Sequence, residues 1–228
     1  MTAIAYNLQA VKSAIAKAAH FAQRQEDNIA LLAVSKTFPS TAIRLAYEAG
    51  QSAFGENYVQ EALDKMNELG DLPLEWHFIG PIQSNKTRLI AENFAWVHSV
   101  DRLKIAERLS AQRLQTLPPL NICIQVNISN EDSKSGILAG DTLKLALELA
   151  KLPRLKLRGL MTIPAPSENP EDQRQPLACL RDLLLQLKSH GLEMDTLSMG
   201  MSHDFEAAIM EGATIVRIGS AIFGERKK

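Results

Sequence analysis

Short apolar segments alternate with longer segments of helical periodicity through nearly all of this chain, and that alternation limits the folds open to it. The predicted strands number eight: Ala30–Lys36, Ser52–Gly55, Glu75–Gly80, Trp96–Ser99, Asn121–Ile128, Lys156–Ile163, Thr196–Met199 and Thr214–Ile218. Helices are predicted to begin between them, near Ser40, Asn57, Ser84, Asp101, Gly140, Glu171 and Asp204. Because helices and not hairpins separate the strands, neighbouring strands should pair in parallel. The sequence therefore predicts an α/β fold, a (β/α)8 TIM barrel, with a doubly wound open sheet as the alternative.

Length and composition favour a single domain over residues 1–228. A chain of 228 residues, 46% of them hydrophobic, can bury one large core and is short for two average domains. No linker rich in Pro, Gly or Ser divides it, and segment 164–170 is predicted to be a long loop between a strand and a helix. Ahead of the first strand, Ile4, Leu8, Val11 and Ile15 recur at helical spacing, which predicts an extra N-terminal helix packed on the barrel.

Charge and cysteine usage exclude several classes of function. The formal net charge of −1 offers no general attraction to nucleic acid or to an anionic membrane. The five histidines are scattered without the spacing of metal ligands, so no metal site is predicted. Cys123 and Cys179 both lie in apolar patterns and are expected to be small core residues, not a disulfide. A reducing cytoplasm suits this pattern, and the N-terminus lacks the continuous apolar stretch of a signal peptide.

Lys36 stands at the end of the first predicted strand, after the apolar run 29–34. Parallel barrels place their chemistry at the carboxyl ends of the strands, so a lysine there is a candidate nucleophile. Partial removal from water lowers the proton affinity of an amine, and a neutral amine can form a Schiff base with an aldehyde. The alternative is a lysine that extends from the strand end into solvent without a chemical role.

The last two predicted strands are followed by segments suited to a phosphate group. Ser198–Ser202 leads into a predicted helix and offers backbone N–H groups and a hydroxyl, while Arg217–Ser220 combines a glycine with a serine. The loops after the seventh and eighth strands of barrels often bind phosphate. Either segment alone could be an ordinary helix cap or turn, but together they predict a phosphate site.

Other polar residues near the predicted strand ends have two interpretations. Glu56 and Asn57 could orient Lys36 or a ligand hydroxyl, or Asn57 could cap the next helix. His77 could stack on a ligand, although a structural histidine explains it equally well. Tyr58 is expected to pack at the start of a helix. Further polar residues expected at this end of the barrel are Gln83, Asn85, Lys86, Asn127, Ser133, Lys134 and Thr162.

Separated motifs, in a fixed order along almost the whole chain, carry a resemblance to a known family. They are Ala33–Thr37, Phe54–Tyr58, Trp76–Gly80 with Gln83–Lys86, Arg158–Met161, Ser198–Ser202 with Asp204, and Val216–Ser220 with Ile222–Gly224. With these motifs the chain closely resembles the YggS/PROSC family of pyridoxal-phosphate-binding proteins, whose fold is similar to the barrel domain of alanine racemase. The resemblance implies the cofactor pyridoxal 5′-phosphate (PLP), bound as a covalent aldimine to Lys36.

The resemblance also implies roles for the other site residues. Ser202, Gly219 and Ser220 would contact the phosphate, Arg217 would lie near the ring nitrogen, and Asn57 would belong to the site. Arginine stays charged and has no acceptor atom, so a ring nitrogen that faces Arg217 should stay unprotonated. PLP would then be a weak electron sink.

The sequence therefore favours a binding protein over an enzyme. The racemases that match take a second proton donor from a separate β domain, and this chain stops eight residues after Ser220. We expect a non-catalytic, cytoplasmic, monomeric protein that holds PLP, supports vitamin B6 and amino-acid homeostasis, and can pass the cofactor to PLP-dependent apoenzymes. The alternatives are a PLP-dependent racemase of low activity and a Schiff-base aldolase that acts on a sugar phosphate.

Overall fold

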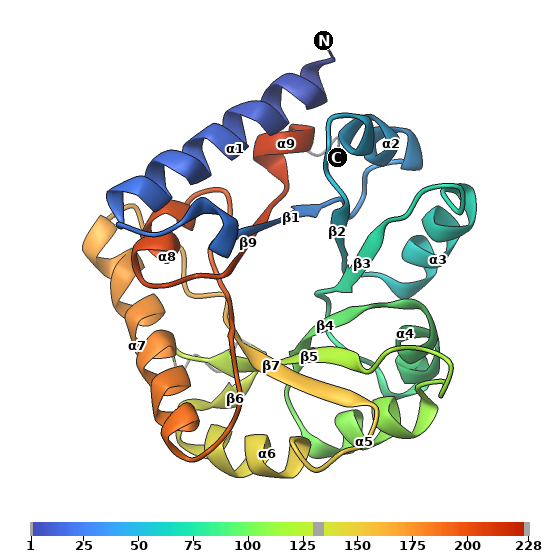
Figure 1. Cartoon of the computed structure of the whole chain (residues 1–228), viewed down its shortest axis with the longest axis vertical. Helices are drawn as coiled ribbons and strands as arrows, with labels where there is room; N and C mark the ends of the chain where they lie inside the picture. Colours follow the sequence, from blue (N-terminus) through green and yellow to red (C-terminus); the bar gives the residue numbers. More distant parts are fainter. Residues whose placement is uncertain (1, 130–134, 226–228) are drawn as a thin grey trace.

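The computed structural model describes residues 2–129 and 135–225 and shows a closed ring of parallel strands surrounded by helices (Figure 1). The barrel strands are β1 (Ala30–Val34), β2 (Ala53–Glu56), β3 (Glu75–Phe78), β4 (Trp96–Val100), β5 (Leu120–Asn127), β7 (Leu155–Met161), β8 (Thr196–Ser198) and β9 (Ile215–Ile218). They pair in the order β4-β3-β2-β1-β9-β8-β7-β5, and pairing of β4 with β5 closes the ring. The predicted TIM barrel is confirmed, and the open sheet is excluded because β4 and β5 are not free edges.

The strands differ from the sequence-based expectation in several bounds, by one or two residues, and in one additional short strand. A short strand, β6 (Ile137–Leu138), pairs in parallel with β5 outside the ring, and two residues are too few to show an alternating pattern. β1 ends at Val34, so the prediction that the strand continues to Lys36 is wrong. Lys36 lies in a turn instead. The next residue, Thr37, has a φ of 69°, a backbone conformation that few residues other than glycine adopt easily.

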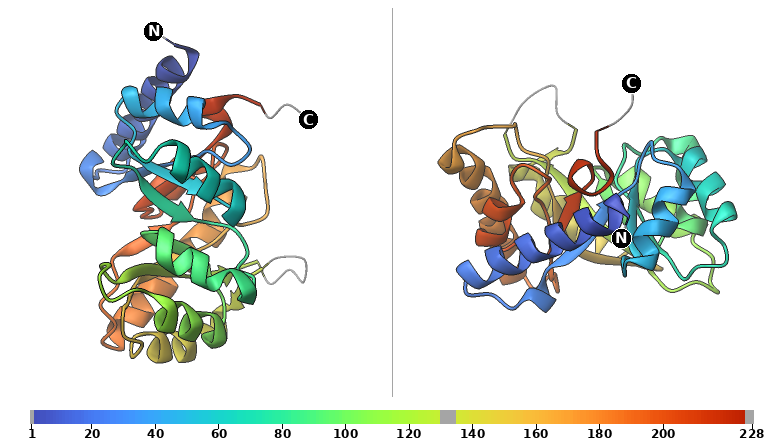
Figure 2. Two further views of the ribbon diagram at one scale, coloured as in Figure 1. Left: turned by 90° about the vertical axis from the view of Figure 1, so that its right-hand side faces the viewer. Right: turned by 90° about the horizontal axis from the view of Figure 1, so that it is seen from above.

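The helices form the outer layer of the barrel. They are α1 (Ala3–Phe21), α2 (Ser40–Glu48), α3 (Val59–Glu68), α4 (Thr87–Asn93), α5 (Leu103–Gln112), α6 (Thr142–Leu149), α7 (Pro170–Ser189), α8 (Phe205–Met210) and α9 (Ser220–Phe223). The predicted N-terminal helix is present as α1, and the Thr2 hydroxyl caps it by accepting from the Ala5 N–H. It lies across the outside of the barrel against α2, α8 and α9 (Figure 2). The buried side of α1 carries Leu8, Val11 and Ile15, as the helical spacing predicts.

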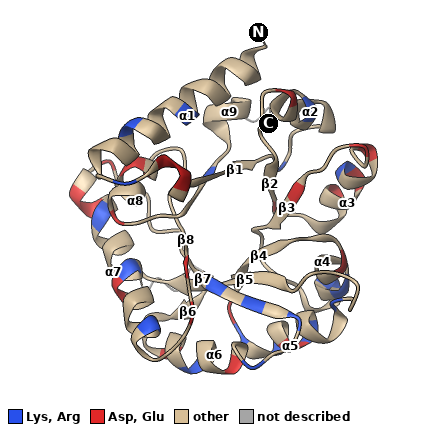
Figure 3. Cartoon of the chain, viewed as in Figure 1, with Lys and Arg blue, Asp and Glu red and all other residues tan. Residues whose placement is uncertain are grey.

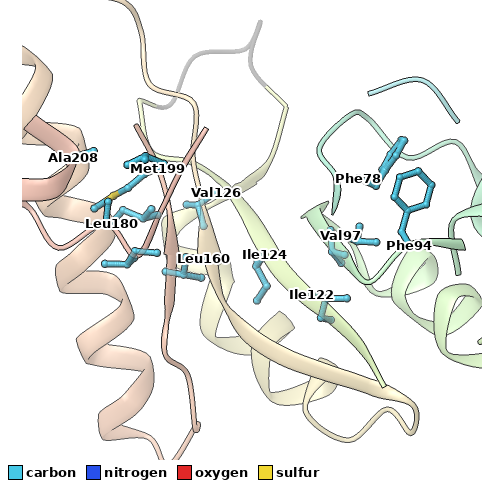
Figure 4. Packing of buried hydrophobic residues seen from close by; sticks show 14 of the residues in the cluster. Phe78, Phe94, Val97, Ile122, Ile124, Val126, Leu160, Leu180, Met199 and Ala208 are labelled. Atoms are coloured by element: carbon cyan, nitrogen blue, oxygen red, sulfur yellow. The ribbon is translucent and has the colours of Figure 1, made fainter. Parts of the chain in front are cut away.

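The hydrophobic core has an outer and an inner part. The outer part fills the space between strands and helices: Leu160 and Met199 lie on the side of the sheet that faces Leu180 of α7, and Phe78 packs edge-on against Phe94 with ring centroids 5.4 Å apart (Figure 4). The inner part lies inside the barrel and consists of Leu32, Trp96, Cys123, Met161 and Ile215. The alternation of each strand therefore sends successive side chains to two different apolar compartments.

The environments of the two cysteines differ. Cys123 is buried inside the barrel, as predicted, and burial raises the pKa of its thiol to about 12. Cys179 is exposed on α7, so the prediction that it belongs to the core is wrong. The leucine stripe of α7 explains the error: Leu180, Leu184 and Leu187 face the core, while Cys179 precedes Leu180 by one position, which turns it about 100° away.

Most charged residues lie on the outer helices and loops, with a few on the strands (Figure 3). Among residues 2–129 and 135–225, no helix is both long and apolar enough to cross a membrane. Within the same part of the chain, His, Cys, Asp and Glu side chains form no group that could hold a metal ion.

Candidate functional site

A cavity of about 220 Å³ lies at the carboxyl ends of the strands, and all the predicted cofactor-binding residues except Asn57 meet there. Its wall contains Lys36 from the turn after β1, Ser202 from the loop after β8, and Arg217, Gly219 and Ser220 from the end of β9 and the start of α9. The rest of the lining is Val34, Ile79, Ile163, Met201 and His203. Residues separated by most of the chain therefore converge because β1 pairs with β9 and β9 with β8.

Behind the Lys36 turn, between β2 and α3, lies a buried cluster of charges. Lys65 Nζ donates to Glu56 Oε1 at 2.8 Å, to Glu61 Oε1 at 2.6 Å and to the Ser35 carbonyl at 2.9 Å. The Ser35 hydroxyl also donates to Glu56 Oε1, at 2.6 Å. Burial raises the pKa of the Glu56 carboxyl, and the Lys65 charge opposes that shift. Glu56 therefore faces the helix layer and not the cavity, contrary to the idea that it orients Lys36 directly.

The same cluster holds the backbone of the lysine turn. The Thr37 N–H donates to Glu61 Oε1 at 2.6 Å, and Lys65 binds the carbonyl of Ser35 on the other side of Lys36. Both peptide neighbours of Lys36 are thus tied to one group of side chains, which supports the unusual φ of Thr37. The half-buried Lys36 side chain projects from a turn whose position is fixed from behind.

The two serines of the predicted phosphate site lie side by side. Ser220 Oγ is 3.3 Å from Ser202 Oγ, within hydrogen-bonding distance. The loop that carries Ser202 is shaped by Asp204, which accepts from the Met201 N–H at 2.6 Å, and by Gly200. Gly200 has a φ of +93°, and a Cβ there would lie 2.6 Å from Ala208 Cβ, so this turn requires glycine.

Gly219 allows the end of β9 to approach β1 closely. A Cβ at this position would lie 3.0 Å from the Val34 carbonyl oxygen, tighter than a side chain normally tolerates. The helix α9 begins at the next residue, Ser220, so its first N–H groups have no acceptor within the helix. The close approach thus brings a hydroxyl and backbone donors to the wall that also carries Lys36.

Arg217 is buried, 4% exposed, where β9 reaches the cavity. Its Nη1 donates to Ser198 Oγ at 2.9 Å and its Nη2 to the Thr162 carbonyl at 2.8 Å. Burial lowers the pKa of the guanidinium to about 10, so it stays charged at neutral pH. Within residues 2–129 and 135–225, no carboxylate forms an ion pair with it.

The cavity wall is therefore cationic. Lys36 and Arg217 line it, and none of the described residues of its wall is an Asp or a Glu. A larger hollow of about 620 Å³ adjoins it, shares Met201 and His203 with it and is bordered by the 164–168 loop. An anionic ligand would gain from the two positive groups, and the adjoining hollow leaves room for a second molecule beside it.

Some candidates of the sequence analysis lie elsewhere. Asn57 does not line the cavity but a neighbouring one of about 230 Å³, together with Gln83 and Lys86. It does not cap α3 either: that helix begins at Val59 without a side-chain cap, and Asn57 Oδ1 is buried with no hydrogen-bond partner among the described residues. Tyr58 is 60% exposed, so the expectation that it packs at the helix start is wrong. Ser133 and Lys134 lie outside the described residues.

Two histidines lie inside the barrel: His77, for which the sequence allows a ligand-stacking or a structural role, and His98, for which it predicts no role. His77 and His98 are 3% and 0% exposed, and their ring nitrogens Nδ1 and Nε2 are 2.9 Å apart. His98 Nδ1 also lies 2.7 Å from Ser198 Oγ, the hydroxyl that Arg217 contacts. Strand alternation predicts that both rings point into the barrel, because their neighbours Trp76, Phe78 and Val97 are apolar and face the helices. It does not predict that the two histidine rings contact each other.

Comparisons with known proteins agree with this geometry. The model of the alanine racemase N-terminal domain matches residues 2–227. The chain is 60% identical to the pyridoxal phosphate homeostasis protein of Pseudomonas aeruginosa, over 99% of this chain and 97% of that one. It is 54% identical to the protein of the same name from Escherichia coli K12, over 99% and 98% of the two chains. The chain thus belongs to the alanine racemase N-terminal domain family, among the members named pyridoxal phosphate homeostasis proteins.

Solved structures show the same fold. PipY of Synechococcus elongatus, solved with PLP bound, is 37% identical and superimposes with a TM-score of 0.86, over 97% of this chain and 100% of that one. Alanine racemase of Corynebacterium glutamicum is 19% identical with a TM-score of 0.72, over 99% of this chain and 62% of that one. The second likeness shows that the barrel is shared with a larger enzyme.

Proposed function

We propose that this chain is a PLP-binding protein of intracellular vitamin B6 and amino-acid homeostasis, and that it binds PLP in the cavity between Lys36 and Arg217. The observation that carries the proposal is the convergence of an amine, a buried guanidinium and two adjacent hydroxyls in one cavity whose described wall contains no acid. Relatives named for pyridoxal phosphate homeostasis and a solved neighbour with PLP bound support it.

The residues present fit this cofactor group by group. PLP supplies an aldehyde carbon that reacts with an amine, a dianionic phosphate and a pyridine nitrogen that can accept a hydrogen bond. Lys36 offers the amine from a turn held by the Lys65 cluster, and we propose that it forms the covalent Schiff base. Ser202, Gly219 and Ser220 offer the hydroxyl and backbone donors suited to phosphate oxygens.

Arg217 is proposed to face the ring nitrogen. Its Nη1 and Nη2 each donate one hydrogen bond to a protein acceptor. A guanidinium has five N–H groups, so others remain to donate to a ligand. Asn57 is proposed to act on the ligand from the neighbouring cavity; its orphaned buried Oδ1 is the kind of group that a ligand or an ordered water satisfies.

We further propose that the protein does not turn over amino acids. The positive charge of Arg217, with a pKa of about 10, opposes protonation of a facing nitrogen and so weakens the electron sink that carbanion chemistry needs. A racemase also needs a proton donor on each face of its substrate. None of Tyr6, Tyr47 and Tyr58 lines the cavity, and beyond Lys36 and Arg217 the described titratable side chain in its wall is that of His203.

The remaining parts of the proposal concern organisation and partners. We propose that residues 1–228 form one PLP-binding domain, that the protein acts in the cytoplasm as a monomer, and that PLP-dependent apoenzymes receive the cofactor. The net charge of −1 supports the absence of nucleic-acid and membrane partners. The open rim of the cavity, where Ser220 is exposed, supports transfer of a bound ligand without unfolding of the barrel.

Absorbance titration tests the proposed function. Wild-type protein mixed with PLP should develop the absorption of a PLP Schiff base, Lys36→Ala should not, and Lys151→Ala, which removes a surface pair with Glu148, should behave as wild type. Deuterium exchange at the α-carbon of added amino acids then measures turnover, and no exchange above free PLP is expected. Rapid exchange by the wild type would identify a racemase, and a colourless protein that cleaves sugar phosphates would identify an aldolase.

A further inference from the structure

A continuous chain of hydrogen bonds crosses the inside of the barrel and ends at Arg217. Glu75 Oε1 lies 2.8 Å from His77 Nε2, and His77 Nδ1 lies 2.9 Å from His98 Nε2. His98 Nδ1 lies 2.7 Å from Ser198 Oγ, which accepts from Arg217 Nη1 at 2.9 Å. We call these five residues the barrel relay.

The barrel relay connects the two ends of the barrel. Glu75 is the first residue of β3, at the amino ends of the strands, and its side chain is 52% exposed to solvent. Arg217 lines the cavity at the opposite end. Between them His77, His98 and Ser198 are almost completely buried beside the apolar inner core. A polar path through such surroundings is stable only when each of its groups has a partner.

The chemistry of the two ends fixes the direction of every bond. A carboxylate only accepts, so His77 Nε2 carries the proton and donates to Glu75. Neutral His77 then accepts at Nδ1 from His98 Nε2–H, and neutral His98 accepts at Nδ1 from the Ser198 hydroxyl. Ser198 in turn accepts from Arg217, which can only donate. All the protons therefore point from Arg217 toward Glu75, and both rings are Nε2–H tautomers.

We propose that the barrel relay is a positioning device for the cavity: Glu75, acting through the two histidines, fixes the Ser198 hydroxyl as an acceptor and so holds the Arg217 guanidinium against the ligand ring. This rests on the proposed function for the identity of the ligand, but not for the relay itself. The Ser198 hydroxyl and the Thr162 carbonyl accept hydrogen bonds from the two terminal nitrogens of Arg217. Loss of one of these hydrogen bonds would let the guanidinium rotate.

Burial favours the neutral state of both rings, although Glu75 opposes the lowering of the His77 pKa. Burial lowers the pKa of His77, and it lowers that of His98 further, where the His77 and Arg217 charges act in the same direction. The His77 N–H lowers the pKa of Glu75, which keeps the acceptor ionised. Trp96 stacks on His77 with ring centroids 5.4 Å apart.

Other charged or titratable groups near the relay come from β5, from β7 and from the loop after β8. The Arg158 guanidinium lies over the Trp96 ring, 4.7 Å from its centroid, and pairs with Asp195. Cys123 and Asp204 act on Arg217 from β5 and from the loop after β8. An imidazolium at His77 would add a second donor where His98 already donates, so acid should break the relay between the two rings.

Nitrogen-15 NMR of the ligand-free protein tests the relay without relying on PLP. At pH 7 both His77 and His98 should show the Nε2–H tautomer, and the terminal nitrogens of Arg217 should exchange slowly. In His98→Leu the Arg217 signals should broaden, while in His98→Gln, which keeps a donor and an acceptor, they should stay sharper. An Nδ1–H tautomer at either ring, or an unchanged Arg217 in His98→Leu, would overturn the proposal.

Equilibrium titration with PLP and with pyridoxal gives a second, independent result. Because Arg217 faces the ring and not the phosphate, His98→Leu should weaken both ligands by about tenfold, the equivalent of one lost bond to a charged group. Met161→Leu, in the same apolar interior, is the matched control and should change neither. Equal affinities of His98→Leu and wild type would contradict the relay, whereas a wild type that binds neither ligand would contradict the proposed function and leave the NMR result standing.

Discussion

Lys65 and Arg217 are both removed from solvent, at 6% and 4% exposure, yet their charges have opposite surroundings. Lys65 lies outside the barrel wall, where two carboxylates, Glu56 and Glu61, bind it. Arg217 lies inside, bound by a hydroxyl and a carbonyl that carry no charge. A buried cation whose charge is already neutralised serves the structure, whereas one whose charge is not neutralised is available to a ligand.

The turn that carries Lys36 and the strand that carries Arg217 are held in place in different ways. The Lys65 cluster fixes the turn of Lys36 from behind, through Ser35 and Thr37. The barrel relay holds Arg217 from the barrel interior, through Ser198. One side of the cavity thus depends on matched charges in the helix layer, and the other depends on a chain of hydrogen bonds that passes through two neutral histidines in the barrel interior.

The largest expected effect on stability is that of Lys65→Met. The substitution leaves Glu56 buried without its cation, so the free energy of unfolding should fall by about 3–5 kcal/mol. Urea denaturation measures it. Lys151→Met, which removes a surface pair with Glu148, is the control and should change stability by less than about 1 kcal/mol. Similar losses in the two variants would show that the buried cluster is not a special source of stability.

Ser202→Ala and Ser220→Ala should each weaken PLP binding without affecting stability. Each hydroxyl is expected to donate to a charged phosphate oxygen, a bond worth roughly 1.5–3 kcal/mol. Fluorescence titration should show this loss for PLP but not for pyridoxal, which has no phosphate. Ser40→Ala removes an exposed hydroxyl outside the cavity and serves as the control. Equal losses for both ligands would mean that the two serines shape the loops and do not bind phosphate.

The two buried histidines should make stability depend on pH. The folded-state pKa values of His77 and His98 are lowered, so the unfolded chain binds more protons below its own histidine pKa of about 6.5. Stability should therefore be complete above about pH 6.5 and fall toward pH 5, by up to about 1.4 kcal/mol per pH unit for each ring. His98→Gln should reduce this slope and His190→Gln, at an exposed position, should not. A slope unchanged by His98→Gln would contradict the buried, neutral assignment.

The smallest expected effect on stability is that of Arg217→Met. The substitution removes a buried charge together with its desolvation penalty, so the free energy of unfolding should stay within about 1 kcal/mol of the wild type. PLP affinity should nevertheless fall. Urea denaturation and PLP titration of the same sample give both values. A loss of stability as large as that of Lys65→Met would erase the distinction between the two cations.

The barrel and the residues of the cavity could be foreseen because they leave local marks in the sequence. Alternating apolar runs predict strands, Lys36 and Ser220 follow strand ends, and Arg217 is the next-to-last residue of the final strand, at the end where barrels place their sites. The pattern does not place Cys179 correctly, because the apolar stripe of a helix must be located to within one residue. The sequence does not reveal the turn at Lys36, because that turn depends on Lys65 and Glu61, which come from a distant helix.

The barrel relay could not be foreseen for a similar reason. Glu75 and His77 are two positions apart on β3, but His98 and Ser198 come from β4 and β8, which do not pair with each other. Their contact depends on closure of the ring and on how far each side chain reaches into it. Periodicity identifies which side of a strand a residue occupies, but it does not identify the residue across the barrel.

The most direct test of the account is to identify the lysine that reacts with PLP. Wild-type protein loaded with PLP is reduced with borohydride, digested, and mapped by mass spectrometry. We predict a single pyridoxyl adduct on Lys36, because that lysine shares a cavity with Arg217 and with the two serines proposed to bind the phosphate. An adduct confined to another lysine, such as Lys86 or Lys134, would contradict it.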